Sequence, residues 1–82
     1  MALEAPAIYE RLTVVFRDVF DDDSVTPTAS TTADDIPDWD SLAHIRLIVA
    51  VEKAFGVRFS AAEAGGMKNV GEFVELIRRK VP

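Results

Sequence analysis

Residues 40–57 of the chain read DSLAHIRLIVAVEKAFGV, a stretch in which apolar residues recur at the spacing of an α-helix. This periodicity predicts a helix over residues 41–55, and Gly56 suits the left-handed conformation that ends a helix. At about 100° per residue, the helix has two apolar sides. One side comprises His44, Leu47, Ile48, Val51 and Phe55, and the other comprises Leu42, Ile45 and Val49. The first side is expected to face a core, so the second needs a different explanation.

Three further helices are predicted from the rest of the chain. Helical spacing of apolar residues marks helices near residues 6–20 and 70–80. A capping signature opens a short helix near residues 60–65, which Gly65 and Gly66 should end. The side chains expected to be buried are those of Phe16, Phe20, Leu47, Val51, Phe55, Phe59, Phe73 and Ile77.

Residues 21–40 show no apolar period and are rich in serine, threonine and proline, which indicates a loop. Ile36 and Trp39 could pin this loop to the helices. The predicted fold is therefore all-α: a small four-helix bundle with three main helices, one short helix, and a long loop between the first and second.

The composition predicts one small globular domain spanning residues 1–82, because 49% of the residues are apolar and 28% are charged. The chain contains no cysteine, which excludes disulfides and cysteine-based metal sites, and we expect no metal site. No apolar run approaches the roughly 20 residues that span a bilayer, and residues 1–4 lack the features of a secretory leader. We therefore expect a cytoplasmic monomer that does not insert into membranes.

The net charge of −5 is divided unevenly along the chain. Residues 1–42 carry ten acidic and two basic residues, whereas residues 43–82 carry four acidic and seven basic residues. The acidic half argues against nucleic-acid binding, because contact with phosphates requires a basic surface. Proteins with basic surfaces are the expected partners of that half.

Ser41 occupies a position where a serine hydroxyl could serve chemistry. It follows the loop and Asp40 and opens a helix, so its side chain should be exposed near backbone N–H groups that stabilise a phosphate. The simpler interpretation is that Asp40 or Ser41 only caps the helix, an interaction that stabilises helices by about 1 kcal/mol. These two residues alone favour the cap.

Asp40-Ser41-Leu42, followed by an apolar helix and by Phe55-Gly56-Val57, resembles the signature of the acyl and peptidyl carrier proteins. The likeness covers residues 7–80 and includes the long loop, the short helix and the final helix. It implies a right-handed four-helix bundle that is not an enzyme. It further implies that Ser41, supported by Asp40, carries 4′-phosphopantetheine on which acyl intermediates are held as thioesters. The implied partners are a phosphopantetheinyl transferase, which largely supplies the base and magnesium that activate the serine, and enzymes that load and process the acyl group.

The resemblance gives the second apolar side of the helix a use. Leu42, Ile45 and Val49 would form an exposed strip on which partner enzymes dock, with Arg46 in the same sector. The alternative is that Leu42 or Ile45 seats the long loop.

Two features depart from the common pattern of fatty-acid carriers. The docking helix of those carriers is typically acidic, whereas this helix has Arg46 and Lys53 and only one carboxylate, Glu52. The approach to the serine, Asp38-Trp39-Asp40, also differs. These departures favour a stand-alone carrier of a dedicated pathway, such as specialised polyketide, modified-lipid or short-acyl metabolism.

Other functions compete with this interpretation. The chain could be a carrier-like interaction module that is never modified, or a peptidyl or aminoacyl carrier, since Asp-Ser-Leu is shared among these groups. Ser41 and His44 are neighbours on a helix, but a hydrolytic pair is disfavoured because the sequence offers no oxyanion hole or orienting acid. We expect His44 to be partly buried and hydrogen-bonded. Trp39 is expected to pack the loop, and contact with the arm or its cargo is the alternative.

Overall fold

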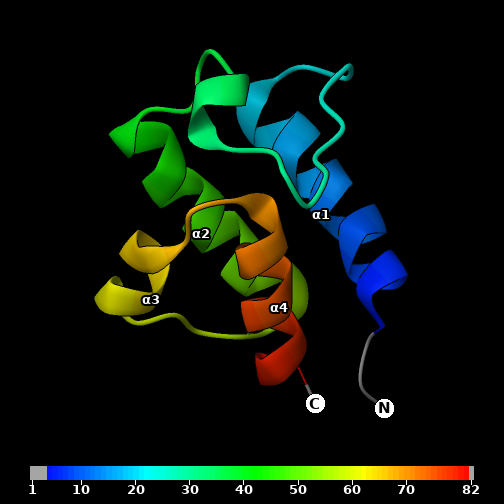
Figure 1. The fold of residues 1–82 in the computed structure, drawn as a ribbon, viewed down its shortest axis with the longest axis vertical. Coiled ribbons are helices and arrows are strands. Elements are labelled where there is room, and N and C mark those ends of the chain that lie inside the picture. The colour runs from blue at the N-terminus through cyan, green and yellow to red at the C-terminus, as the bar shows by residue number, and fades with distance from the viewer. Residues whose placement is uncertain (1–3, 82) are drawn as a thin grey trace.

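The computed structural model describes residues 4–81 as an assembly of helices (Figure 1). The α-helices are α1 (Ala5–Phe20), α2 (Ser41–Phe55), α3 (Ala61–Gly66) and α4 (Val70–Lys80), and a short 3-10 helix, η1 (Ala33–Asp35), interrupts the loop after α1. Residues 4–81 contain no β-strand, which confirms the predicted all-α fold of three main helices and one short helix. Residues 1–3 and 82, which the predicted domain includes, lie outside the described part.

The ends of the main helices are set by residues with specific backbone roles. Pro6 lies in the first turn of α1, where a missing N–H is tolerated, and Asp21 follows that helix in the left-handed conformation with φ 50°. Gly56 ends α2 with φ 67°, as predicted. Asn69 caps α4 by accepting a hydrogen bond from the N–H of Glu72. The three main helices therefore lie where the sequence predicts them, to within one residue.

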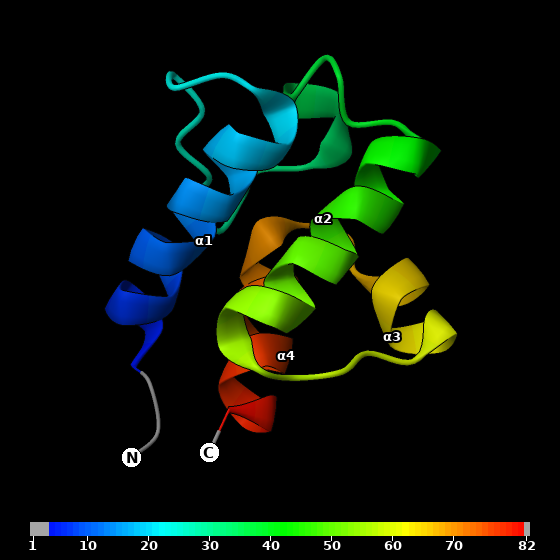
Figure 2. The same ribbon diagram turned by 180° about the vertical axis from the view of Figure 1, so that it is seen from behind.

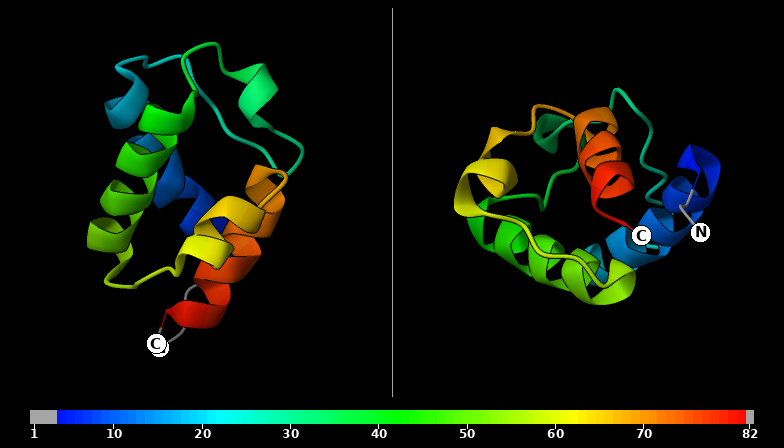
Figure 3. Two further views of the ribbon diagram at one scale, coloured as in Figure 1. Left: turned by 90° about the vertical axis from the view of Figure 1, so that its left-hand side faces the viewer. Right: turned by 90° about the horizontal axis from the view of Figure 1, so that it is seen from below.

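The three main helices enclose the hydrophobic core. Helix α1 packs against α2 and α4, and the view from below shows α3 on the side of the molecule opposite α1 (Figure 3). The loop between α1 and α2 crosses the end of the molecule at which α1 ends and α2 begins (Figure 2). The buried core side chains are Ile8, Leu12, Val15, Phe16, Phe20, Ile36, Leu47, Ile48, Val51, Phe55, Val57, Val70, Phe73, Val74, Ile77 and Val81. No helix within residues 4–81 is both long enough and apolar enough to cross a membrane.

One detail of the prediction is wrong. Phe59 is half-buried rather than buried, because it lies on the connection between α2 and α3 and only part of its ring packs against Phe73. Helix α3 lies within one residue of its predicted position and ends at Gly66, the second of the two glycines, with Met67 as its C-cap residue.

The long loop is anchored to the core by Ile36 and Trp39, the two side chains predicted to pin it. Ile36 is buried, and Trp39 is half-buried against two aromatic side chains of α1. The ring centroid of Trp39 lies 5.3 Å from that of Phe16 and 6.0 Å from that of Phe20. This packing holds the segment that leads directly into α2.

The same loop also binds the start of α4 through its backbone. The carbonyl of Ala29 accepts a hydrogen bond of 2.9 Å from the N–H of Gly71, and the carbonyl of Thr31 accepts one of 2.8 Å from the N–H of Val70. The first N–H groups of a helix have no partner within the helix, so the loop supplies acceptors that the helix lacks. Loop and helix therefore hold each other in place.

Gly71→Ala should lower the free energy of unfolding by about 1–3 kcal/mol, the usual cost of overpacking. A Cβ at this position would lie 2.9 Å from the carbonyl oxygen of Ala29, so the loop would have to move away from α4. Gly65→Ala is the matched control, since a Cβ there meets nothing within 4 Å. It should raise stability by about 0.4–1 kcal/mol through the lower entropy of the unfolded chain. Urea unfolding followed by circular dichroism measures both changes, and equal effects of the two variants would contradict the close loop contact.

Candidate functional site

The start of α2 assigns separate roles to Asp40 and Ser41. Asp40 is the N-cap residue, and its Oδ1 accepts a hydrogen bond of 2.8 Å from the N–H of Ala43. Ser41 is the first residue of the helix, and it is exposed. Because Asp40 caps the helix, the Ser41 hydroxyl is not required for that purpose.

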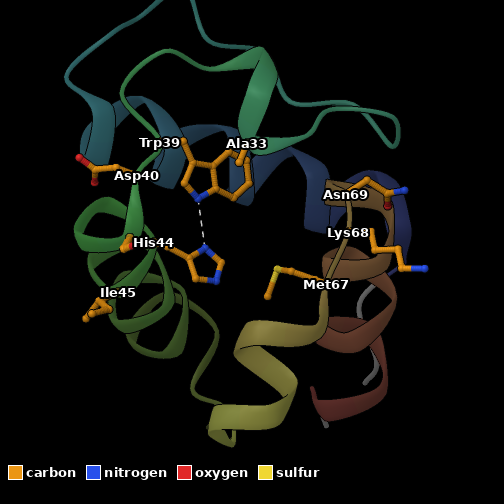
Figure 4. A pocket seen from close by; sticks show the side chains of 9 residues that line it. Ala33, Trp39, Asp40, His44, Ile45, Met67, Lys68 and Asn69 are labelled. Carbon is orange, nitrogen blue, oxygen red and sulfur yellow. Dashed lines mark hydrogen bonds between the residues drawn. The ribbon is translucent and has the colours of Figure 1, made fainter.

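A pocket of about 520 Å³ opens beside Ser41 (Figure 4). Its walls come from the loop, from the first turns of α2 and from the segment between α3 and α4. The lining residues are Ala33, Trp39, Asp40, Ser41, His44, Ile45, Met67, Lys68 and Asn69. Met67, Lys68 and Asn69 were not predicted as site residues, because more than twenty residues of chain separate them from Ser41 and no motif links them to it.

Trp39, His44 and Ala64 form a chain of hydrogen bonds at this pocket. The Nε1–H of Trp39 donates to Nδ1 of His44 over 3.1 Å, and Nε2 of His44 lies 2.7 Å from the carbonyl oxygen of Ala64 on α3. An indole N–H is only a donor, so Nδ1 must accept and Nε2 must carry the proton that it donates to Ala64. His44 is therefore the neutral Nε2–H tautomer when both bonds are made.

This arrangement confirms the expected state of His44 and excludes its use as a base for Ser41. The side chain is partly buried, and both ring nitrogens are engaged with groups other than the serine. Trp39 packs the loop as expected. The hydrogen bond between Trp39 and His44 was not predicted from the sequence, although the two residues are only five positions apart at the start of α2.

Helix α3 is fixed in a position from which Ala64 reaches His44. Ser60 and Glu63 form a capping box, with hydrogen bonds of 2.9 Å and 3.1 Å. Glu63 also pairs with Nζ of Lys80 on α4 at 3.0 Å. The backbone N–H of Ser60 and, next, the hydrogen bond from Lys80 hold the pKa of the Glu63 carboxyl below its ordinary value. Because the carboxylate form is the one that is bound, this support for α3 weakens when acid protonates Glu63.

The second apolar side of α2 is open to solvent. The exposed fractions are 58% for Leu42, 61% for Ile45 and 42% for Val49. Arg46 is exposed on the same helix. Leu42 and Ile45 are thus too exposed to serve as buried anchors for the loop, and Ile45 also borders the pocket. Among residues 4–81, no group of three or more His, Cys, Asp or Glu side chains is arranged to hold a metal ion.

Comparison with known proteins finds a clear match among solved structures. No protein-family model and no curated protein matches the chain. Among solved structures, the chain is similar to the solution structure of a holo acyl carrier protein from Geobacter metallireducens. The two share 44% sequence identity over 88% of this chain and 83% of that one, with a TM-score of 0.83. With this identity, this coverage and the same helical fold, the chain belongs to the acyl carrier protein family.

Proposed function

We propose that Ser41 is the residue to which phosphopantetheine is attached, so that acyl groups are carried on an arm that leaves the start of α2. The observation that carries this proposal is the position of Ser41. It is the exposed first residue of α2, directly after the Asp40 cap and beside the pocket. The similarity to a holo carrier supports it, because a carrier of that kind needs one accessible attachment hydroxyl.

The residues around Ser41 fit a phosphodiester. The first N–H groups of α2 carry partial positive charge, which favours a phosphate at this end of the helix. Asp40 keeps the helix start intact through its bond to Ala43 and adds a negative charge that can engage the transferase or its metal. A bound arm supplies a terminal thiol that holds an acyl group as a thioester. The chain itself positions the arm and presents it to other enzymes, which perform the chemistry.

The intact mass of the protein tests this function. The wild-type chain, incubated with coenzyme A, magnesium and a promiscuous phosphopantetheinyl transferase, should gain the mass of one phosphopantetheine group. Peptide mapping should place that mass on the peptide that contains Ser41. An unchanged mass, with a known carrier modified in the same tube, would instead support the alternative of an interaction module that is never modified.

We further propose that partner enzymes dock on the exposed strip of α2 formed by Leu42, Ile45 and Val49, together with Arg46. The strip is apolar and lies next to the attachment site. Arg46 and Lys53 are both exposed on the same helix, so its charge is unlike that of an acidic docking helix. A matching partner presents an apolar groove with at least one carboxylate at its rim.

Arg46→Glu should weaken the reaction with the cognate loading enzyme by roughly 1–2 kcal/mol, because one attractive pair becomes repulsive. Folding should be nearly unchanged at this exposed site. Val49→Ala should also slow loading, but with little dependence on salt, because apolar contacts are not screened. The measurement is kcat/KM for loading at several ionic strengths.

Two controls separate docking from general effects in this experiment. Val14 on α1 is an apolar residue that is 67% exposed, so Val14→Ala removes similar surface elsewhere. Arg79→Glu makes the same charge change at an exposed position of α4. Both controls should load at the wild-type rate. Equal rates for Arg46→Glu, Val49→Ala and the wild type would mean that recognition lies elsewhere, with the long loop as the next candidate.

The proposed role is that of a cytoplasmic, monomeric carrier in a dedicated pathway rather than in housekeeping fatty-acid synthesis. The support is the basic character of α2 and the Asp38-Trp39-Asp40 approach to the serine. An aminoacyl or peptidyl carrier is the second candidate, because the Asp-Ser-Leu motif is common to both groups. The mass of the species released from the arm after isolation from the native cell distinguishes an acyl from an aminoacyl cargo.

A further inference from the structure

The pocket beside Ser41 is separated from the hydrophobic core by a wall. The indole of Trp39 lies between the pocket and α1, where it packs edge-on against Phe16 and also contacts Phe20. Phe16 is fully buried. Figure 4 shows the indole and the imidazole of His44 side by side at the pocket, with Met67 facing them from the segment after α3. An apolar tail tethered at Ser41 that passed from the pocket toward Phe16 would have to displace the Trp39 indole.

Hydrogen bonds connect this wall to three elements of the structure. Trp39 comes from the loop, His44 from α2, and the carbonyl of Ala64 from α3, and hydrogen bonds of 3.1 Å and 2.7 Å connect them in series. The planes of the Trp39 and His44 rings are inclined by only 23°, with their centroids 6.0 Å apart. A tail that passed between His44 and Ala64 would have to break the hydrogen bond that joins them.

We propose that the Trp39–His44–Ala64 chain sets the length at which cargo enters the core, so that acyl groups of up to about six carbons stay in the pocket or in solvent and longer groups enter. This inference rests on the proposed attachment at Ser41. Trp39 and His44 are then specificity-determining residues, since they set the chain length at which an acyl group begins to enter the core.

The size of the opposing effects sets that length. Loss of the two hydrogen bonds lowers the equilibrium constant for entry of the acyl group into the core by about 30-fold, at roughly fivefold for each bond. Exposure of roughly 100 Å² of the Trp39 surface disfavours it by about a further 100-fold. Each apolar carbon that leaves water favours entry by about fourfold, so the five apolar carbons of a hexanoyl group contribute about 1000-fold. A hexanoyl group should therefore stay mostly outside the wild-type core and enter when the hydrogen bonds are removed.

The test compares acetyl and hexanoyl thioesters on protein that mass spectrometry has first shown to carry the arm. Hydroxylamine cleaves exposed thioesters, and each rate is divided by that of the same acyl thioester of free pantetheine. In the wild type, the hexanoyl rate should lie within about twofold of the acetyl rate. In His44→Leu, which has a side chain of similar size that cannot bond, hexanoyl should be protected by about tenfold and acetyl should not.

If His44→Leu folds poorly, a second variant and an NMR measurement on the wild type test the same inference. Trp39→Phe removes the indole donor and part of the ring but keeps the hydrogen bond from His44 to Ala64, and it should give intermediate protection. In the wild-type protein, NMR should show hexanoyl-dependent shifts at Ile45 and Met67 of the pocket but not at Leu47, which is fully buried. Strong hexanoyl protection in the wild type, or no protection in either variant, would overturn the inference. Failure of the arm to attach would instead count against the proposed function.

Discussion

Phe73→Ala should lower the free energy of unfolding by about 3–5 kcal/mol, the usual range for deleting a buried phenyl ring. Phe73 is fully buried on the core-facing side of α4, and its ring centroid lies 5.7 Å from that of Phe59. Removing the ring loses its transfer free energy and leaves a cavity that the helices can only partly fill. A domain of this size has a total stability of roughly 4–12 kcal/mol, so the variant should be close to unfolding.

Denaturant unfolding at equilibrium measures this change, with circular dichroism as the probe. Arg79→Ala is the matched control, because it lies on the same helix and is exposed. It should alter stability by no more than about 0.5 kcal/mol. An equal and small effect of the two substitutions would contradict the packing of α4 against the core.

The sequence predicts the helices well because their signals are local. Apolar periodicity marks the buried faces, and single residues such as Asp40, Gly56 and Asn69 terminate helices by interactions that span only a few positions. The exposure of the Leu42, Ile45 and Val49 strip follows from the same periodicity, since it lies opposite the core-facing side.

The pocket could not be predicted because it is built from long-range contacts. His44 meets Ala64 through a backbone carbonyl, and any residue type could supply that acceptor, so no side-chain pattern reports it. The contact of the loop with Gly71 likewise uses the carbonyl of Ala29. Phe59 was expected in the core because of its residue type alone. Its actual half-burial depends on long-range contacts with Phe73 and Lys80 of α4.

Ser41→Ala should abolish attachment of the phosphopantetheine arm and leave the fold unchanged. The side chain is exposed, and the helix start is held by the hydrogen bond from Ala43 to Asp40, which the substitution does not touch. Ser60 offers the matched control, because it is also an exposed serine at the start of a helix, but it acts as the N-cap of α3.

The experiment measures intact mass over time for the wild type, Ser41→Ala and Ser60→Ala with a promiscuous transferase and coenzyme A. Ser60→Ala should be modified fully, although loss of its cap should lower stability by about 1 kcal/mol. Asp40→Asn separates the two roles of Asp40, since asparagine also caps helices but carries no charge. Slower modification of this variant with unchanged stability would assign the effect to the charge. A Ser41→Ala protein that gains the arm at the wild-type rate would refute the assignment of Ser41, because the modified hydroxyl would then have to lie elsewhere.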